Sequence, residues 1–303
     1  MKTFDLNILD GGLDSGAKLR RMWLFKSGRK RSILITGATD GLGFALAKNL
    51  AMYPETHLLL HGRNSEKLGH LKKEIDEIAP NSSANYYLAD FSSLREVRQM
   101  AQKISKDFTS IDVLINNAGL GVESQRKLSE DGFELIFQVN YLSAYLLTKL
   151  LLPCLARGDS PRILNIASRS QQAIVLDDLM LEKKWTGLRA YCQSKLALVM
   201  MAVQLAPEMS KIGIAINAIH PATLMPTKIV QGQFEPRDSL AEGVRNVIAL
   251  VLDSKIGDYT GTYIDRSTQS KALSQVYDKN VQNFLKRESD KACGLPENSA
   301  SAL

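Results

Sequence analysis

One stretch of the chain decides its fold, and it reads Ser32-Ile33-Leu34-Ile35-Thr36-Gly37-Ala38-Thr39-Asp40-Gly41-Leu42-Gly43. A short apolar run, typical of a buried strand, passes directly into a turn with three glycines, and a helical pattern follows. Glycines in such a turn let the backbone approach a pyrophosphate, whose charge is stabilised by the N-terminus of the next helix. A glycine-rich turn can also be purely structural, but its place between a strand and a helix favours a dinucleotide-binding role.

Outward from this stretch, short apolar runs alternate with segments of helical period to about residue 265. The predicted strands are Ile33–Thr36, His57–His61, Ala84–Leu88, Val113–Ile115, Arg162–Ala167, Ile214–Ile219 and Tyr263–Ile264. The predicted helices cover residues 43–52, 65–78, 93–107, 130–156, 189–210, 239–253 and 274–291. Asn64 is expected to cap the second helix, and Ser93 with Glu96 to form a capping box on the third.

Strands that alternate with helices form parallel βαβ units with right-handed crossovers. The expected fold class is therefore α/β: a single doubly wound, Rossmann-type domain with a mainly parallel seven-stranded sheet and helices on both faces. We predict a basic extension over residues 1–31, the domain over residues 32–293, and a short polar tail over residues 294–303.

The charge of the chain is concentrated at its start. Residues 1–31 hold eight lysines and arginines and three aspartates, which is +5 of the formal net charge of +6. The rest is nearly neutral, so no nucleic-acid partner is expected. The extension is either a solvated tail or a weak peripheral contact with an anionic membrane or partner.

Two further patterns bear on where the chain works. No uninterrupted apolar run approaches the roughly 18 residues of a membrane span, and the start does not resemble a secretory signal. The three cysteines show neither pairing nor metal-ligand spacing, and the four histidines show no metal spacing. We expect a cytoplasmic location and no metal site.

The end of the second predicted strand bears on which dinucleotide is bound. It reads His61-Gly62-Arg63-Asn64, with no acidic residue to accept the ribose hydroxyls of NAD. The guanidinium of Arg63 could pair with a 2′-phosphate or could be solvated at the surface. Asp40 argues the other way, since a carboxylate would repel that phosphate. We predict NADP as the preferred cofactor, with NAD as the alternative, and leave Asp90 either capping the next helix or touching the adenine.

A second group of polar residues follows the later strands. Asn116-Asn117-Ala118-Gly119 closes the fourth strand and Ser168 closes the fifth, at the sheet edge where doubly wound folds bind ligands. Tyr191 and Lys195 lie four residues apart and so share one helix face. Each pattern is common by itself, but their order on these elements predicts an active site.

Taken together, these motifs resemble the short-chain dehydrogenase/reductase family over about residues 32–288. The spacing of Gly37, Gly41 and Gly43 resembles its simple dehydrogenases, and the long spacer from Ser168 to Tyr191 resembles the retinol dehydrogenase-like branch. The resemblance implies a catalytic tetrad of Asn140, Ser168, Tyr191 and Lys195, and a homodimer paired through the helices at 141–156 and 196–206. It also implies cofactor contacts from Gly37, Thr39, Asp40, Gly41, Leu42, Gly43, Arg63, Asp90, Phe91, Asn117, Ala118, Gly119, Tyr191, Lys195, Pro221 and Thr223.

One segment departs from the family pattern. His220-Pro221-Ala222 stands where the family usually has Pro-Gly after the sixth strand. The backbone path beside the nicotinamide is therefore less well defined by the resemblance. Thr227 lies near the place where a contact with the cofactor carboxamide is expected.

The function implied is that of an NADP(H)-preferring oxidoreductase that interconverts an alcohol and a ketone or aldehyde. A free tyrosine, with a pKa near ~10, is a poor base, and the ammonium of Lys195 would favour its phenolate. Tyr191 would then act as general acid or base, with Ser168 on the same substrate oxygen and Asn140 supporting a water in the proton relay. Apolar residues suggest a lipophilic small molecule as substrate, namely Leu176, Leu224, Met225, Ile229 and Phe234.

Two other functions compete with this one. A non-catalytic NADP-binding regulator or scaffold would have no need of the proton donor Tyr191. An epimerase or dehydratase is disfavoured by the glycine spacing. Hydride transfer measured against alcohols and ketones would separate the three.

Overall fold

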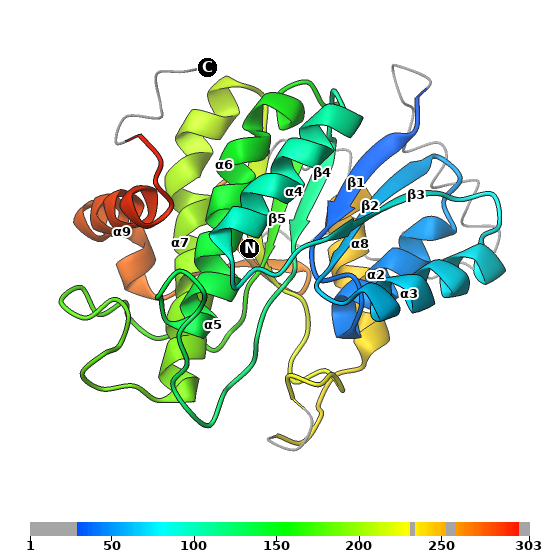
Figure 1. Cartoon of the computed structure of the whole chain (residues 1–303). Helices are drawn as coiled ribbons and strands as arrows, with labels where there is room; N and C mark the ends of the chain where they lie inside the picture. Colours follow the sequence, from blue (N-terminus) through cyan, green and yellow to red (C-terminus); the bar gives the residue numbers. More distant parts are fainter. Residues whose placement is uncertain (1–28, 231–233, 253–258, 297–303) are drawn as a thin grey trace.

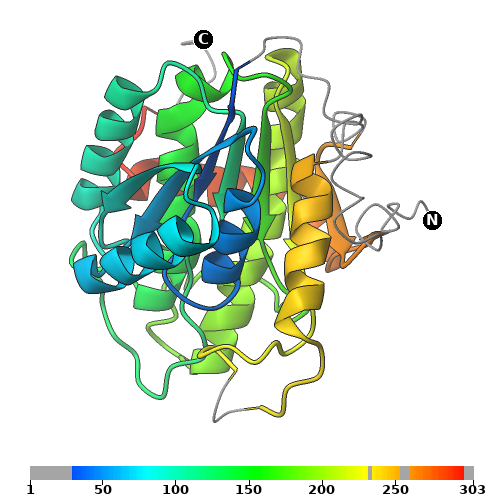
Figure 2. The ribbon, with the colours of Figure 1, turned by 90° about the vertical axis from the view of Figure 1, so that its right-hand side faces the viewer.

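The computed structural model describes residues 29–230, 234–252 and 259–296. These residues form one α/β layer structure in which a single twisted sheet has helices on both faces, as Figures 1 and 2 show from two directions. The predicted fold class is confirmed. The predictions for residues 1–28 and for most of the C-terminal tail lie outside the described residues.

Seven strands of the sheet are parallel and an eighth is antiparallel. They are β1 (Arg31–Ile35), β2 (Thr56–Gly62), β3 (Ser83–Leu88), β4 (Val113–Asn116), β5 (Arg162–Ile166), β6 (Ala215–His220), β7 (Thr262–Asp265) and β8 (Thr268–Ser270). Their order is β3-β2-β1-β4-β5-β6-β7-β8, so the direction of winding reverses between β1 and β4. The crevice at such a switch point is where doubly wound sheets bind ligands.

The helices fall into two layers, one on each face (Figure 1). On one face lie α2 (Gly41–Ala51), α3 (Ser65–Ile78) and α8 (Leu240–Leu252), whose apolar sides form one core cluster with the sheet. On the other lie α4 (Leu94–Asp107), α6 (Ser143–Leu155), α7 (Gly187–Lys211) and the last helix, α9 (Lys279–Ala292), which contribute to a second cluster. Burial on both faces explains why the parallel strands are nearly continuous apolar runs.

The prediction of seven strands was short by one. β8 pairs with β7 in an antiparallel hairpin, Asp265 opposite Thr268. Arg266 in its two-residue turn has a φ of 56°, a left-handed conformation that such turns require. No Asn-Gly or Asp-Gly pair marks this turn, so no local pattern indicates the extra strand.

Several helix ends differ from the predictions. The helix expected at 130–156 begins at Leu135 as α5 (Leu135–Phe137), passes through the π-helical turn η2 (Gln138–Leu142) and continues as α6. The last predicted helix starts as a 3₁₀ turn, η4 (Ser274–Tyr277), and α9 begins only after Asp278, whose carboxylate caps it. Asn64 caps α3 as predicted.

The predicted capping box on α4 is absent. Ser93 occupies the N-cap position, but its side chain makes no capping hydrogen bond. The amide of Leu94 donates instead to the carboxylate of Asp131, and Glu96 accepts from the amide of Asp90. The carboxylate of Asp131, distant in sequence, therefore caps α4 in place of the side chain of Ser93.

The described residues on both sides of the predicted boundary at residue 32 are joined by hydrogen bonds to one aspartate. β1 starts at Arg31, and the guanidinium of Arg29 pairs with the buried carboxylate of Asp112 at 2.5 and 2.9 Å. The same carboxylate accepts from the amides of Ser32 and Asp159. Asp112 thus ties together the start of β1 and the segments before β4 and β5.

Candidate active site

A cleft of about 840 Å³ opens at the carboxyl ends of the strands, on both sides of the switch point between β1 and β4. Its size falls within the usual range for ligand sites. All the residues that the sequence analysis assigned to the cofactor line it, and so do Ser168, Tyr191 and Lys195. Asn140 is buried behind the wall of the cleft. The described structure thus brings the predicted site residues together.

The glycine-rich turn between β1 and α2 has no room for a side chain at Gly37 or Gly43. Gly37 has a φ of 65°, and a Cβ on it would lie 2.8 Å from the Cα of Ala118. A Cβ on Gly43 would lie 2.2 Å from the carbonyl oxygen of Gly37. The backbone is therefore exposed to the cleft at the N-terminus of α2, and it fits the pyrophosphate cradle that the fold implies.

The loop after β4 supports this turn. The side-chain amide of Asn117 donates to the carbonyl oxygens of Thr36 and Gly37, at 2.8 and 3.1 Å. The hydroxyl of Thr36 accepts from the backbone amides of Asn117 and Ala118. Asn117 is therefore committed to the backbone of the turn, so its side chain positions the cradle.

His61 is a site residue to which the sequence analysis gave no role. Its Nδ1 accepts from the amide of Gly37 at 3.1 Å, so its Nε2 carries the proton and donates to the carbonyl oxygen of Ala89. Burial lowers its pKa to about 4, which keeps the ring neutral. Phe91, a predicted cofactor residue, stacks on this ring with centroids 4.2 Å apart. A lone histidine at the end of a predicted strand does not indicate this contact with the glycine-rich turn.

The carboxylate of Asp40, which by itself would repel a phosphate, has two basic partners. Its Oδ2 accepts from the ammonium groups of Lys67 at 2.9 Å and of Lys228 at 2.8 Å. Burial would raise its pKa, but the hydrogen bonds from the two lysines together hold that pKa below its ordinary value. Arg63 lines the same part of the cleft. The local charge is therefore positive in spite of Asp40.

Asp90 lies at the cleft after β3 and caps a turn. Its Oδ1 accepts from the amide of Ser92 at 2.8 Å. Of the two roles left open for it, the structure shows capping, although of the turn before α4 and not of the helix itself. Its place in the cleft wall keeps an adenine contact as a prediction.

Tyr191 and Ser168 both line the cleft, and their side chains are hydrogen-bonded to each other. Tyr191 lies in the first turns of α7, which Thr186 caps, and Ser168 follows β5. Burial raises the pKa of Tyr191, and a hydrogen bond with Ser168 opposes that rise. The amide of Ser170 donates to the Ser168 hydroxyl and fixes its direction. The two hydroxyls are placed to share one substrate oxygen.

Lys195 lies one helical turn after Tyr191. Its ammonium donates to the carbonyl oxygen of Ile166 at 2.8 Å and lies 5.8 Å from the centroid of the Tyr191 ring. Burial lowers its pKa to about 8, so the charged form still predominates at neutral pH. A cation held at this distance favours the phenolate form of Tyr191.

Asn140 lies in the π-helical turn η2, a feature that is frequent at functional sites. Its side-chain oxygen accepts from the amide of Leu120, and its amide group donates to the Leu120 carbonyl and to Ser194 Oγ. These contacts orient the loop after β4 beside Lys195. The water-supporting role implied by the resemblance stays a prediction.

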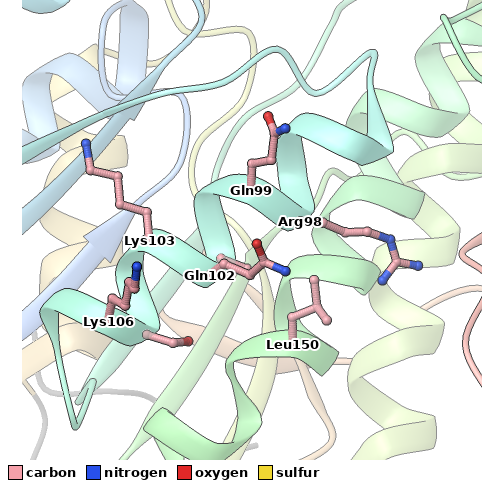
Figure 3. A pocket seen from close by; sticks show the side chains of 8 residues that line it. Arg98, Gln99, Gln102, Lys103, Lys106 and Leu150 are labelled. Carbon is pink, nitrogen blue, oxygen red and sulfur yellow. The ribbon is translucent and has the colours of Figure 1, made fainter.

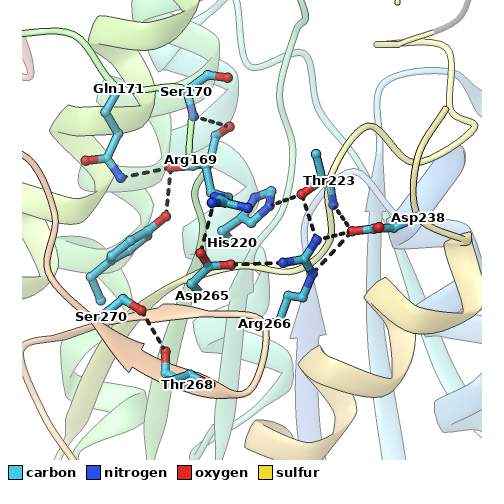
Figure 4. A network of polar contacts seen from close by, with 12 residues as sticks. Arg169, Ser170, Gln171, His220, Thr223, Asp238, Asp265, Arg266, Thr268 and Ser270 are labelled. Carbon is cyan, nitrogen blue, oxygen red and sulfur yellow. Dashed lines mark hydrogen bonds and ion pairs between the residues drawn. The ribbon is translucent and has the colours of Figure 1, made fainter. Parts of the chain in front are cut away.

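The segment after β6 is held by a charged network that the sequence analysis missed (Figure 4). Arg266 pairs with Asp238 at 2.6 Å, and both contact Thr223, whose amide donates to the Asp238 carboxylate. The Thr223 hydroxyl also lies 3.1 Å from His220 Nε2. The network joins the two ends of the segment between Thr223 and Asp238, and it leaves the Thr223 hydroxyl already bonded within the protein.

The described part of that segment before residue 231 lines the cleft. Thr227, expected near the carboxamide, lies against Gly41 at the phosphate turn: a Cβ on Gly41 would be 3.2 Å from its methyl group. Of the five apolar residues predicted to meet the substrate, Leu224, Met225, Ile229 and Phe234 line the cleft, and Leu176 does not.

A second hollow, of about 660 Å³, lies between α4 and α6 (Figure 3). It is lined by Arg98, Gln99, Ala101, Gln102, Lys103, Ser105, Lys106 and Leu150. None of the predicted site residues is among them. The chemistry is therefore assigned to the cleft at the switch point.

Comparisons with known proteins show the family of this chain. The family model described as short chain dehydrogenase matches residues 31–238. Retinol dehydrogenase 13 from Homo sapiens is 31% identical over 284 residues, which are 88% of this chain and 85% of that protein. Polyprenol dehydrogenase from Homo sapiens is 30% identical over 287 residues, covering 88% and 86%.

A solved structure shows the same fold. NADPH-bound carbonyl reductase from chicken fatty liver superposes with a TM-score of 0.63 at 22% identity, over 81% of this chain and 100% of that one. The family model covers more than half of the chain, and the two human relatives match most of it. The chain therefore belongs to the short chain dehydrogenase family of oxidoreductases, in its retinol dehydrogenase-like branch.

Proposed function

We propose that the protein is an NADP(H)-dependent oxidoreductase that interconverts a lipophilic alcohol and its aldehyde or ketone. The observation that carries this proposal is the grouping of Tyr191, Ser168 and Lys195 in one cleft with the glycine-rich turn. A cofactor-binding regulator would need the turn but not this arrangement of proton donor and ammonium group. The arrangement of these side chains therefore supports a catalytic function over that of a regulator.

The proton chemistry follows from the positions of these side chains. The bound nicotinamide supplies or accepts the hydride. Tyr191 donates its proton to the carbonyl oxygen during reduction and takes the proton from the alcohol during oxidation. Ser168 holds the same oxygen by a hydrogen bond. Lys195 stabilises the phenolate that remains, since its ammonium lies 5.8 Å from the ring centroid.

The walls of the cleft favour a lipophilic substrate. Leu188, Ile229 and Phe234 line it and are among the exposed large apolar residues, with 46%, 37% and 45% of their surface accessible. The two human relatives are named for retinol and polyprenol, both lipophilic alcohols. We therefore propose a long-chain or isoprenoid alcohol, or its carbonyl form, as the substrate class.

A hydride-transfer screen tests the function. Purified protein is assayed by nicotinamide absorbance with NADPH and NADH, against isoprenoid and aliphatic aldehydes and small polar ketones. Turnover with the lipophilic carbonyls is the expected result. Cofactor binding without turnover of any compound would favour the regulator, and turnover of polar compounds alone would overturn the substrate class.

Replacement of Arg63 tests the preference for NADP(H). Arg63 lies at the end of β2 in the same part of the cleft as Lys67, and no carboxylate follows β2 to receive ribose hydroxyls. Arg63→Ala should lower kcat/KM with NADPH about tenfold, because it removes a hydrogen bond to a charged group. This is the low end of the range for such a bond, since the side chain of Arg63 is exposed. The effect with NADH should be within twofold. Equal losses with both cofactors, or a wild-type preference for NADH, would refute this assignment.

The state of assembly is a further proposal. The expected homodimer pairs through helices of the 141–156 and 196–206 segments, but α9 of the same chain packs on them. Tyr141 and Tyr145 bond with Ser289 and Asp290, and Gln204 with the backbone of Gln282. This packing supports a monomer, and the homodimer stays an untested prediction. Analytical ultracentrifugation should give the mass of a monomer, 33.5 kDa. A mass twice as large would support the homodimer instead.

A cytoplasmic location is likewise proposed, not shown. The three cysteines are free and buried, as is ordinary for a protein of a reducing compartment. Among the described residues, only the stretch Leu135–Leu155 is long and apolar enough to span a membrane, and 83% of it is buried inside the fold, as in a core helix. Cell fractionation tests the proposal, and recovery in the membrane fraction would contradict it.

A further inference from the structure

A short turn of the segment after β6 lies across the cofactor half of the cleft. It covers residues 227–230 and is closed by a hydrogen bond from the amide of Val230 to the carbonyl oxygen of Thr227. On one side it packs on Gly41 of the phosphate turn. On the other, the backbone of Ile229 packs on Gly121, where a Cβ would meet it at 3.2 Å. The turn therefore contacts both sides of the switch point.

The side chain between these two contacts is Lys228, and it points to the phosphate turn. Its ammonium lies 2.8 Å from Asp40 Oδ2, the same oxygen that Lys67 contacts from α3 at 2.9 Å. Lys228, Lys67, Asp40 and Arg63 all line the cleft. The two lysines leave a formal charge of +1 around the Asp40 carboxylate, and Arg63, which follows β2, adds a cation to the same cleft. This surplus of positive charge suits a phosphate monoester but not a pair of neutral hydroxyls.

Both lysines keep accessible surface while they contact Asp40. The side chain of Lys228 is 70% exposed and that of Lys67 is 47% exposed. Each ammonium has three donors, so the bond to Asp40 leaves donors for a second anion. Asp40 thus gathers the two lysines at one place, and its own negative charge is more than compensated there.

We propose that Lys228 binds the 2′-phosphate of NADP(H) together with Lys67 and Arg63, and that the phosphorylated cofactor thereby fixes the 227–230 turn over the cleft. This inference rests on the proposed preference for NADP(H). It makes Lys228 a specificity-determining residue carried by the same segment that lines the substrate side of the cleft through Leu224 and Met225. Recognition of the phosphate is then coupled to the position of the substrate-contacting segment.

Direct binding measurements test the role of Lys228 without relying on activity. Wild type, Lys228→Gln and the control Lys72→Gln are titrated by calorimetry with NADP⁺ and NAD⁺, and with adenosine 2′,5′-bisphosphate and 5′-AMP. Lys72 is an exposed lysine of α3 that pairs with Asp76, outside the cleft. Lys228→Gln should weaken binding of NADP⁺ and of the bisphosphate about five- to tenfold, as expected for an exposed charge-assisted contact. NAD⁺ and 5′-AMP should change by less than twofold, and Lys72→Gln should match wild type.

Hydrogen exchange of the backbone amides of residues 227–230 gives a second readout. NADP⁺ should protect them more than NAD⁺ does in the wild type, and Lys228→Gln should abolish this difference. If the wild type does not prefer NADP⁺, the proposed cofactor preference itself fails. If it does, but Lys228→Gln keeps that preference or weakens both cofactors equally, the role of Lys228 alone is refuted.

Discussion

Tyr191→Phe should lower turnover by at least ~10²-fold while the affinity for NADP(H) stays within about twofold. The substitution removes only the hydroxyl that donates or accepts the proton, and general acid catalysis by one side chain contributes at least that factor. Its contact with Ser168 is lost, but Ser168 is also held by the amide of Ser170. Steady-state kinetics with the best substrate of the screen, together with a cofactor titration, measure both quantities.

A second tyrosine provides the control for this variant. Tyr87 on β3 is buried, and its hydroxyl donates to Asp107, away from the cleft. Tyr87→Phe should leave turnover within twofold, although it removes a comparable hydrogen bond. A Tyr191→Phe enzyme that turns over like the Tyr87→Phe enzyme would mean that another group transfers the proton.

Asp112→Ala should lower the free energy of unfolding by about 3 kcal/mol or more. The carboxylate is fully buried and accepts from the amides of Ser32 and Asp159 as well as from Arg29. Its removal leaves the two buried amides without their acceptor, which costs roughly 1–3 kcal/mol for each. The loss of the pair with Arg29 adds little, because that side chain is 36% exposed. Urea denaturation monitored by circular dichroism gives the difference directly.

Two controls separate this effect from a general loss of charge. Asp76→Ala removes an exposed carboxylate that pairs with Lys72, and it should cost less than ~0.5 kcal/mol. Deletion of residues 1–28 retains Arg29 and should leave a folded, active enzyme, whereas deletion of residues 1–31 should destabilise it. An Asp112→Ala protein as stable as Asp76→Ala, or a loss of folding on deleting residues 1–28, would contradict this account of the domain start.

Patterns that are local in the chain were readable from the sequence. The alternation of strands and helices, the turn from Thr36 to Gly43 and the spacing of Tyr191 and Lys195 each depend on residues a few positions apart. Backbone geometry then fixes their relation, because a helix brings residues four apart onto one face and a parallel strand ends at the same sheet edge as its neighbours. The fold class, the family and the place of the cleft followed from these patterns.

The tertiary structure alone decided which distant side chains meet. Asp40 counted against a phosphate while its partners were unknown, because Lys67 lies 27 positions away and Lys228 lies 188 positions away. In the same way Asp131 replaces the local cap of α4, and Asp112 extends the domain back to Arg29.

The physical reason is the same in each case. The period of the apolar residues indicates which face of a strand or helix is buried. The partner of a polar side chain follows no such period, because it is set by how the elements pack. Charge at a site is a sum over all the groups that packing brings there. For this protein the sequence by itself determined the fold and the family, and only the packing determined that the charge around Asp40 is positive.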